Sequence, residues 1–213
     1  MKTDWEIRRE ICQYGKKVYD KGFVAATDGN ISMRMMGDRL FITPSASCLG
    51  TLNVNDLVYV DFNSQVLQSH SNPSSELPMH LEIYKKRPDV NAIIHTHPAN
   101  STAFTVAGEN FSEPVLPELI LGIGDIPIAK YATPSTNESA IVISDLIKKH
   151  DVIILDHHGV VTVGKDLQEA FYKLERLEHA ASTLLAAKQL GNINPLNPSD
   201  IEKLHKIKQK YLS

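Results

Sequence analysis

Two short apolar runs of this 213-residue chain end in closely spaced histidines. Residues 91–97 read NAIIHTH, and residues 152–158 read VIILDHH. Apolar runs of this length, bounded by polar residues, are typical of strands buried inside a sheet. The chain must therefore bury both strands in one core while it accommodates imidazole groups at their ends.

The remaining segments alternate between helical and strand-like patterns. Apolar residues at helical spacing, with suitable start and stop signals, predict helices over residues 4–21, 75–86, 138–149 and 167–190, one after Pro98 and a last one that opens at 197–200. Strands are predicted over residues 31–35, 39–43, 56–62, 90–95, 126–131 and 152–155. Because the early strands are hairpin-like, we expect an α/β fold in three layers (αβα), with a central, mostly antiparallel sheet flanked by helices.

Composition narrows the class of protein. Hydrophobic residues make up 42% of the chain, and neither a repeat nor a shift in composition marks a linker, so we expect one domain over residues 1–213. The net charge is −3 without a run of like charges, which argues against nucleic-acid and membrane partners. No secretory signal or span-length apolar run is visible, so we expect a cytoplasmic protein. Cys12 and Cys48 are expected to be reduced thiols.

The histidine pairs are candidate metal ligands. In an extended strand, His95 and His97 project from one face and can approach the same cation. Of His157 and His158, which face opposite ways, only one is expected to join them. Taken alone, a His-x-His pair is as readily a chance occurrence as a pair of metal ligands. A closed structural zinc site usually recruits cysteines, whereas three histidines with an open position favour a catalytic metal.

A second candidate segment is SNPSSELPMHLEIY at residues 71–84. Ser75 is a good N-cap and Pro78 suits the first turn, so the stretch predicts an ordinary helix start. Free amides and hydroxyl groups at such a start also form an anion site that suits a phosphate. Glu76 and His80 are four residues apart and therefore share one face of this helix.

Two turns rich in small and hydroxyl residues, TDGNIS at 27–32 and TPSAS at 43–47, complete the set of candidate segments. Both are explained as ordinary turns. Both also offer backbone N–H groups that can converge on a phosphate.

In their order along the chain, seven motifs resemble the class II aldolase and adducin head-domain family. The motifs are GNIS, ITPS, PSSE followed by His80, RPDVNAIIHTH, PIAKYAT, LDHHGVV and GKDLQEAF. They span nearly the whole chain. The resemblance implies a class II aldolase-like fold, one divalent metal per subunit with zinc before manganese, and a homotetramer.

The resemblance also implies roles for individual residues. The metal ligands are His95, His97, His158 and Glu76, and Glu76 then acts as the base. The positions that cradle the substrate phosphate are Gly29, Asn30, Ser45, Ala46, Ser74 and Ser75, with Ala46 replacing the usual glycine. In the family, a tyrosine from a neighbouring subunit protonates the aldehyde oxygen; this chain has Glu118 in the corresponding segment, and Tyr211 resembles a second family tyrosine that reaches the pocket.

The implied activity is that of a metal-dependent aldehyde-lyase of carbohydrate metabolism. It reversibly cleaves a ketose 1-phosphate, such as fuculose 1-phosphate or a related deoxy-pentulose or deoxy-hexulose 1-phosphate, to dihydroxyacetone phosphate and an aldehyde. Cleaving a C–C bond next to a ketone leaves an enediolate, and a divalent metal stabilises its charge as a Lewis acid. Neutral imidazole ligands keep the site positive, which suits an anionic intermediate.

Alternatives remain within and outside this class. A metal-dependent decarboxylase, dehydratase or epimerase of a sugar phosphate passes through a similar enediolate. Decarboxylase-like relatives can have lysine where this chain has Ser75, which favours the aldolase, although TPSASCLG also resembles those decarboxylases. A non-catalytic scaffold like the adducin head domain is a further alternative, which the retained histidines and Glu76 disfavour. A Schiff-base aldolase would need a lysine in an apolar strand, and none stands out.

Overall fold

A mixed sheet forms the centre of the computed structural model, which describes residues 2–111 and 113–212 except the side chains of residues 211 and 212. Within the described residues, eight strands form one sheet in the order β4-β3-β2-β1-β5-β8-β7-β6. The strands are β1 (Asn30–Met35), β2 (Arg39–Ile42), β3 (Val58–Asp61), β4 (Val66–Gln68), β5 (Ala92–Thr96), β6 (Ile128–Ala129), β7 (Val152–Leu155) and β8 (Gly159–Gly164). Among the described strands, β6 and β7 alone pair in parallel, which confirms the predicted, mostly antiparallel sheet.

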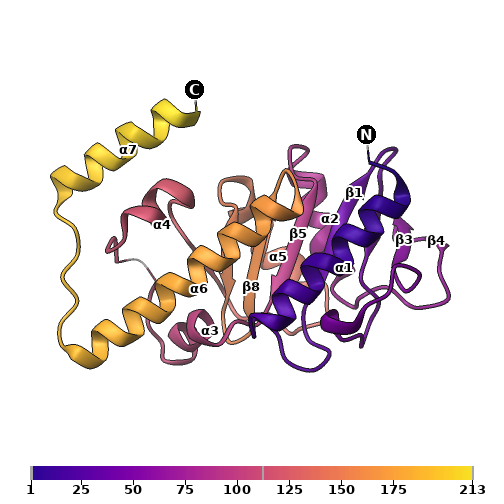
Figure 1. Ribbon diagram of the computed structural model, residues 1–213, viewed down its shortest axis with the longest axis horizontal. Helices are drawn as coiled ribbons and strands as arrows, with labels where there is room; N and C mark the ends of the chain where they lie inside the picture. The colour runs from indigo at the N-terminus through magenta and orange to yellow at the C-terminus, as the bar shows by residue number, and fades with distance from the viewer. Residues whose placement is uncertain (1, 112, 213) are drawn as a thin grey trace.

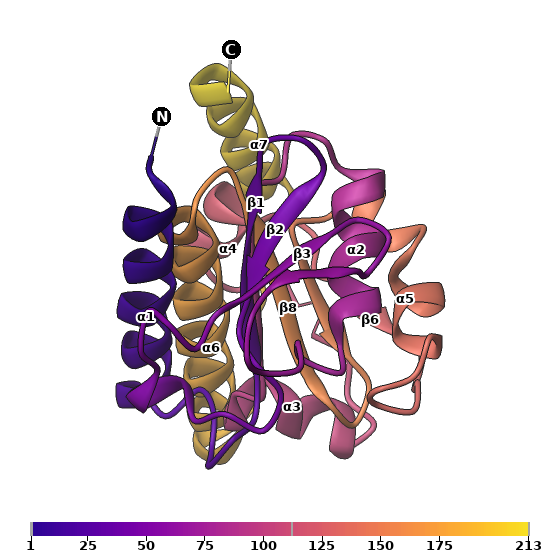
Figure 2. The same cartoon turned by 90° about the vertical axis from the view of Figure 1, so that its right-hand side faces the viewer.

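Helices cover both faces of the sheet, giving three layers (Figure 2). One face packs against α1 (Asp4–Asp20) and α6 (Leu167–Leu190), and the other packs against α2 (Leu77–Lys86) and α5 (Glu138–Ile143). The alternation of strand side chains explains the two cores, because Ile94 joins the first cluster and Ile93 joins the second. Both faces of β5 are therefore apolar, and the predicted αβα fold is confirmed.

Several helices begin and end as the sequence predicts. Thr3 and Glu6 form a capping box at the start of α1, and Gly22, with a φ of +70°, follows its end. Asp166 caps α6 by accepting a hydrogen bond from the Glu169 amide at 2.8 Å. The helix expected after Pro98 is α3 (Ala99–Val106).

Several features differ from the sequence prediction. The N-cap of α2 is Glu76 rather than Ser75, whose hydroxyl is hydrogen-bonded to the Ser135 hydroxyl instead. The helix expected over 138–149 divides into α5 and a short 3-10 helix, η2 (Leu146–Lys148), and the strand expected over 126–131 shrinks to β6. The exposed strand β4, the buried strand β8 and the short helix α4 (Pro117–Gly122) were not predicted. A further 3-10 helix, η1 (Leu49–Thr51), contacts α1.

The C-terminal helix α7 (Pro198–Leu212) lies apart from the sheet, beside α4 (Figure 1). An extended segment connects it to the end of α6. The Lys208 ammonium donates hydrogen bonds to the carbonyl groups of Ile120 and Ile123 at the end of α4, at 3.2 and 3.0 Å. Among the described helices, none is both long enough and apolar enough to cross a membrane.

Candidate active site

Strand register brings three histidines together at one end of β5 and β8. Thr96 pairs with Val160, so the end of β5, where His97 follows, meets the start of β8, where His158 precedes. The centroids of the His95, His97 and His158 rings lie 4.8–4.9 Å from one another. Their ring nitrogens form a group that can hold a metal ion.

Gly159 allows this close approach. A Cβ atom at this position would lie 2.3 Å from the Thr96 carbonyl oxygen and 2.7 Å from the His97 ring. His157, on the other side of the turn, is exposed and pairs with Asp156 at 2.7 Å. Of the two adjacent histidines, His158 therefore joins the group and His157 lies outside it.

His95 is fully buried, and a hydrogen bond from its Nδ1 holds the ring in place. Its Nδ1 lies 3.0 Å from the Val160 carbonyl oxygen, to which it donates. Its Nε2 lies 2.9 Å from Glu76 Oε2 and 3.1 Å from His97 Nε2. Fixing Nδ1–H in this way leaves Nε2 as the nitrogen that can bind a metal. Burial lowers the pKa of His95, but the Glu76 carboxylate outweighs burial and raises it in the metal-free protein.

Glu76 is the carboxylate of the site. Although burial raises its pKa, the His95 ring, a hydrogen bond from Asn30 and the His158 ring outweigh burial and lower it, so Glu76 is ionised at neutral pH. Its Oε2 accepts from Asn30 Nδ2 at 2.8 Å. Its Oε1 is buried without a hydrogen bond and lies 3.6 Å from His158 Nε2. A buried, ionised carboxylate oxygen without a hydrogen bond is costly unless a cation completes its environment.

The electrostatics of the other two histidines favour metal binding. Burial, followed by the charge of His95, lowers the pKa of both His97 and His158 to about 4. Both rings are therefore neutral at pH 7 and offer lone pairs. Tetrahedral Zn–N bonds of about 2.0–2.1 Å place two ligand nitrogens about 3.4 Å apart, close to the 3.1 Å between His95 Nε2 and His97 Nε2. Three imidazole nitrogens and one carboxylate oxygen thus fit a divalent metal.

The three candidate phosphate loops lie side by side next to Glu76. The Ile31 amide donates to Thr43 Oγ1 at 3.1 Å, which joins the turn before β1 to the loop after β2. The Ser74 amide donates to the Thr43 carbonyl oxygen at 3.1 Å, and the Ser45 amide donates to the Asn72 carbonyl oxygen at 3.0 Å. Because these two amides are engaged, Ser45 and Ser74 can offer an anion their hydroxyl groups.

Two positions in these loops have left-handed backbone conformations. Gly29 has a φ of +76°, and a Cβ there would lie 2.8 Å from the His95 carbonyl oxygen, so only glycine fits. Ala46 has a φ of +55°, a conformation that costs a non-glycine residue energy and is retained here at an exposed loop. Strain at Ala46 therefore coincides with the departure from the glycine that the family resemblance implies.

The hydroxyl groups of Ser75 and Ser135 lie 2.7 Å apart, which joins the candidate phosphate loops to the segment before α5. Ser135 has a φ of +63°, and hydrogen bonds at Thr133 and Glu138 hold its loop. Sequence reasoning did not select Ser135, because a TPST turn is ordinary loop chemistry.

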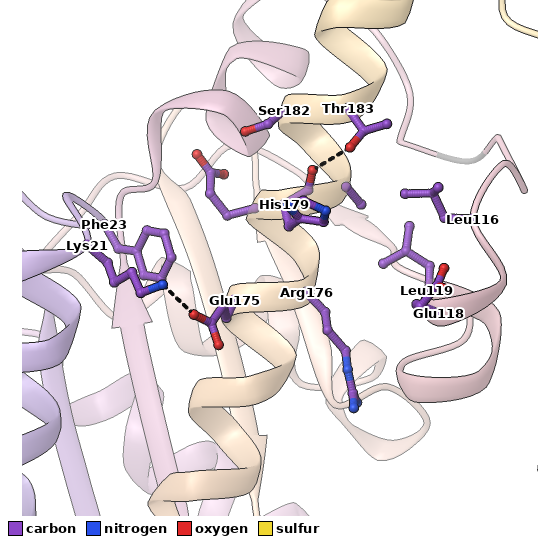
Figure 3. Close-up of a pocket in the computed structure, with 12 residues that line it drawn as sticks. Lys21, Phe23, Leu116, Glu118, Leu119, Glu175, Arg176, His179, Ser182 and Thr183 are labelled. Carbon is purple, nitrogen blue, oxygen red and sulfur yellow. Dashed lines mark hydrogen bonds and ion pairs between the residues drawn. The ribbon is translucent and has the colours of Figure 1, made fainter.

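Glu118 and Tyr211 lie in a different part of the chain. Glu118 is exposed on α4 and lines a cavity of about 790 Å³ whose lining does not include the three histidines (Figure 3). Lys21, on the opposite side of this cavity, forms an ion pair of 2.7 Å with Glu175. The side chain of Tyr211 is outside the described residues. Within one chain, the described contacts thus do not bring Glu118 to the histidines.

One buried group that the sequence prediction missed is Glu178 of α6. Its carboxylate accepts from the amides of Asn100 and Ser101 and from the Ser101 hydroxyl, each at 2.9 Å. Pro98 is the N-cap of α3 and has no side-chain acceptor, so Glu178 caps this helix from a distance. A charged residue on the buried face of a helix is the sequence signal that marks such a position.

Comparison with known proteins identifies the class. A model of the class II aldolase and adducin N-terminal domain matches residues 9–185. An L-fuculose phosphate aldolase from Methanococcus maripaludis is 40% identical over 164 residues, covering 77% of this chain and 88% of that protein. A 3-oxo-tetronate 4-phosphate decarboxylase from Haemophilus influenzae is 31% identical over 206 residues, covering 95% of this chain and 97% of that protein.

Solved structures agree. YgbL from Klebsiella pneumoniae, described as an aldolase, epimerase or decarboxylase, has a TM-score of 0.87 at 28% identity and covers 96% of this chain and 100% of its own. An L-fuculose 1-phosphate aldolase has a TM-score of 0.86 at 28% identity, with coverage of 97% and 96%. The chain belongs to the class II aldolase and adducin family. At the level of the family, it is an enzyme of the lyase class, as expected.

Proposed function

We propose that this protein is a metal-dependent aldolase that reversibly cleaves a ketose 1-phosphate to dihydroxyacetone phosphate and an aldehyde. The observation that carries the proposal is the position of Glu76, which lies between three imidazole rings and the loops of the candidate phosphate cradle. In this arrangement a phosphate anchored by the loops of Gly29, Ser45 and Ser75 brings the adjacent carbons of the substrate to a single carboxylate.

Metal binding and proton transfer are assigned to specific residues of the site. His95, His97, His158 and Glu76 would hold one divalent metal, zinc before manganese because nitrogen donors predominate. The bound cation supplies Lewis-acid stabilisation of the charge that develops on the substrate oxygens. Glu76 moves a proton to or from the carbon next to the ketone, because its Oε1 has no hydrogen-bond partner among the described residues. Burial of the site excludes water and strengthens these interactions.

The proton on the aldehyde oxygen requires a second group. We propose Glu118 or Tyr211 of a neighbouring subunit in a homotetramer, because Glu118 is exposed and lies away from the histidines of its own chain. We further propose that the chain is one domain over residues 1–213, acts in the cytoplasm on small phosphorylated sugars, and binds neither nucleic acid nor membranes. Its net charge of −3 supports the last point.

A second candidate is a decarboxylase of a sugar-acid phosphate. It is favoured by the coverage of the decarboxylase relative, which exceeds that of the aldolase relative, 95% against 77% of this chain. The hydroxyl of Ser75, hydrogen-bonded to Ser135, favours the aldolase, since the resemblance implies a lysine at this position in decarboxylases.

The test is a substrate panel with the zinc-loaded protein. Fuculose, rhamnulose, ribulose and 5-deoxyribulose 1-phosphates are assayed for release of dihydroxyacetone phosphate, and 3-oxo-tetronate 4-phosphate is assayed for release of CO₂. We expect chelator-sensitive cleavage of one of the ketose 1-phosphates. CO₂ release without ketose cleavage would replace the proposal with the decarboxylase. A zinc-loaded protein inactive on every compound would replace the proposal with the dehydratase, epimerase or non-catalytic scaffold alternatives.

A further inference from the structure

A chain of hydrogen bonds runs through the buried protein behind Glu76. Asn30 Nδ2 donates to Glu76 Oε2 at 2.8 Å, and Asn30 Oδ1 lies 2.6 Å from His80 Nε2. Ser32 Oγ lies 2.7 Å from His80 Nδ1 and 2.8 Å from the Tyr84 hydroxyl. All five side chains are at most 7% exposed. His80 thus faces the interior rather than open solvent.

Donor and acceptor chemistry fixes which group donates in each of these hydrogen bonds. An ionised carboxylate only accepts, so the amide NH₂ of Asn30 must face Glu76 and its carbonyl oxygen must face His80. His80 Nε2 therefore carries a hydrogen. Burial, followed by the charge of His95, lowers the pKa of His80 to about 3, so the ring is neutral and Nδ1 accepts from Ser32. Ser32 in turn accepts from Tyr84.

The opposite tautomer would break the pattern. With the hydrogen on Nδ1, His80 Nε2 would have to accept from Asn30. The amide of Asn30 would then turn its carbonyl oxygen toward the Glu76 carboxylate, where two acceptors would face each other without a hydrogen between them. Leaving such buried groups unpaired costs about 1–3 kcal/mol.

The fold holds both ends of this series of hydrogen bonds rigidly. Asn30 and Ser32 are two residues apart on β1 and project from one face, while His80 and Tyr84 are one helical turn apart on α2. Asn30 also pairs with His95 across the ladder between β1 and β5. The same strand position therefore connects α2 with a histidine of the metal group.

We propose that His80 is a positioning residue: through Asn30 it fixes the Glu76 carboxylate so that Oε2 stays beside His95 Nε2 and Oε1 faces His158. The inference rests on the proposed role of Glu76 as the proton-transfer group. Groups that orient metal ligands from behind typically change metal affinity or activity by about 10–100-fold when they are removed.

The first test is the tautomer, which requires no turnover. In nitrogen-15 spectra of the metal-free protein at pH 7, we expect His80 to be neutral with its hydrogen on Nε2. A hydrogen on Nδ1 alone would overturn the proposal, because His80 could then not orient Asn30.

The second test compares two substitutions of His80. His80→Met removes the donor and keeps the volume, whereas His80→Gln keeps a donor for Asn30. We expect His80→Met to lower zinc affinity and kcat by about 10–100-fold with KM changed less than about threefold, and His80→Gln to restore most of both. The control is Ile83→Ala, a fully buried position of the same helix, which should lose stability without losing zinc affinity or kcat.

The outcomes separate this inference from the proposed function. If the wild-type protein cleaves a ketose 1-phosphate and His80→Met retains its kcat and zinc affinity, the inference is wrong and the function stands. If the wild-type protein cleaves none of the sugars, zinc affinity still decides: a loss in His80→Met but not in Ile83→Ala supports the inference.

Discussion

The two ends of this molecule differ in how completely their side chains are held. Behind Glu76, the side chains of Asn30, Ser32, His80 and His95 are buried and hydrogen-bonded, and the ring centroids of the three histidines of the metal group lie within 5 Å of one another. Around α4 and α7, Glu118 is exposed and α7 contacts little besides α4. The difference shows that the candidate metal group is assembled within one chain, whereas Glu118 lies at the surface, where a second chain can reach it.

The largest effect is expected at the buried end. Glu76→Gln keeps the size of the side chain but removes the base, so kcat should fall by at least about a hundredfold. Zinc content, measured by mass spectrometry of the purified variant, shows whether the metal is retained. Full turnover with zinc bound would show that another group transfers the proton.

Metal removal is expected to abolish activity and lower thermal stability. A cation that binds only the folded protein stabilises it by about 2.7 kcal/mol at a hundredfold excess over its Kd. Melting curves before and after chelation, followed by zinc addition, measure this effect. If the chelated protein kept both its activity and its melting temperature, the histidine group would not be a functional metal site.

The histidines also predict how the metal-free protein responds to pH. His97 and His158 have pKa values of about 4 when folded, because of burial and then the charge of His95, against about 6.5 when unfolded. Between these values the unfolded chain binds more protons, so the free energy of unfolding should fall as pH falls from 6.5 to 4. His95, with its raised pKa, offsets part of this loss.

Melting temperatures of the metal-free protein at pH 5 and pH 7 check this prediction. His158→Asn removes one of the two titrating rings and should flatten the dependence. A melting temperature that did not fall toward pH 5 would contradict the neutral state of these rings.

Much of this contrast is visible in the sequence, for physical reasons. The apolar runs before His95 and His157 predict buried strands, and their spacing places imidazoles at one end of the sheet. By contrast, α4 and the cap provided by Glu178 depend on contacts between distant segments, which local pattern does not encode. Ser75 was wrongly predicted as the N-cap: Glu76 occupies that position, and the Ser75 hydroxyl is hydrogen-bonded to Ser135, which lies 60 residues away in the sequence.

Glu178 caps α3 and also lines the cavity that Glu118 lines. Its substitution should therefore have an effect between those at the buried end and those at the surface end. Glu178→Gln turns an NH₂ group toward an amide of α3, three or four residues after His97, and should cost about 1–3 kcal/mol of the free energy of unfolding. Because α3 begins beside the metal group, zinc affinity should also weaken.

The matched control is Asp166→Ala, which removes the cap of α6 and should cost about 1 kcal/mol without changing zinc affinity. Urea unfolding and zinc titration of both variants measure the difference. If the two variants bound zinc equally well, Glu178 would stabilise the fold without affecting the metal group.

The smallest effect is expected at the surface end. Lys208→Met removes two hydrogen bonds from the end of α4 and should lower the free energy of unfolding by about 0.5–1 kcal/mol. Zinc affinity should be unchanged. Urea unfolding measures the first quantity, and a loss as large as that of Glu178→Gln would show that α7 is an integral part of the core.

The most direct test of the proposed aldolase chemistry uses dihydroxyacetone phosphate alone, so it does not depend on the identity of the aldehyde. The zinc-loaded protein is incubated with this compound in D₂O, and proton NMR follows exchange at the hydroxyl-bearing carbon. We predict deuterium uptake that chelation abolishes and that Glu76→Gln slows by at least about a hundredfold. No uptake by a zinc-loaded wild-type protein would contradict proton transfer by Glu76 in an aldolase.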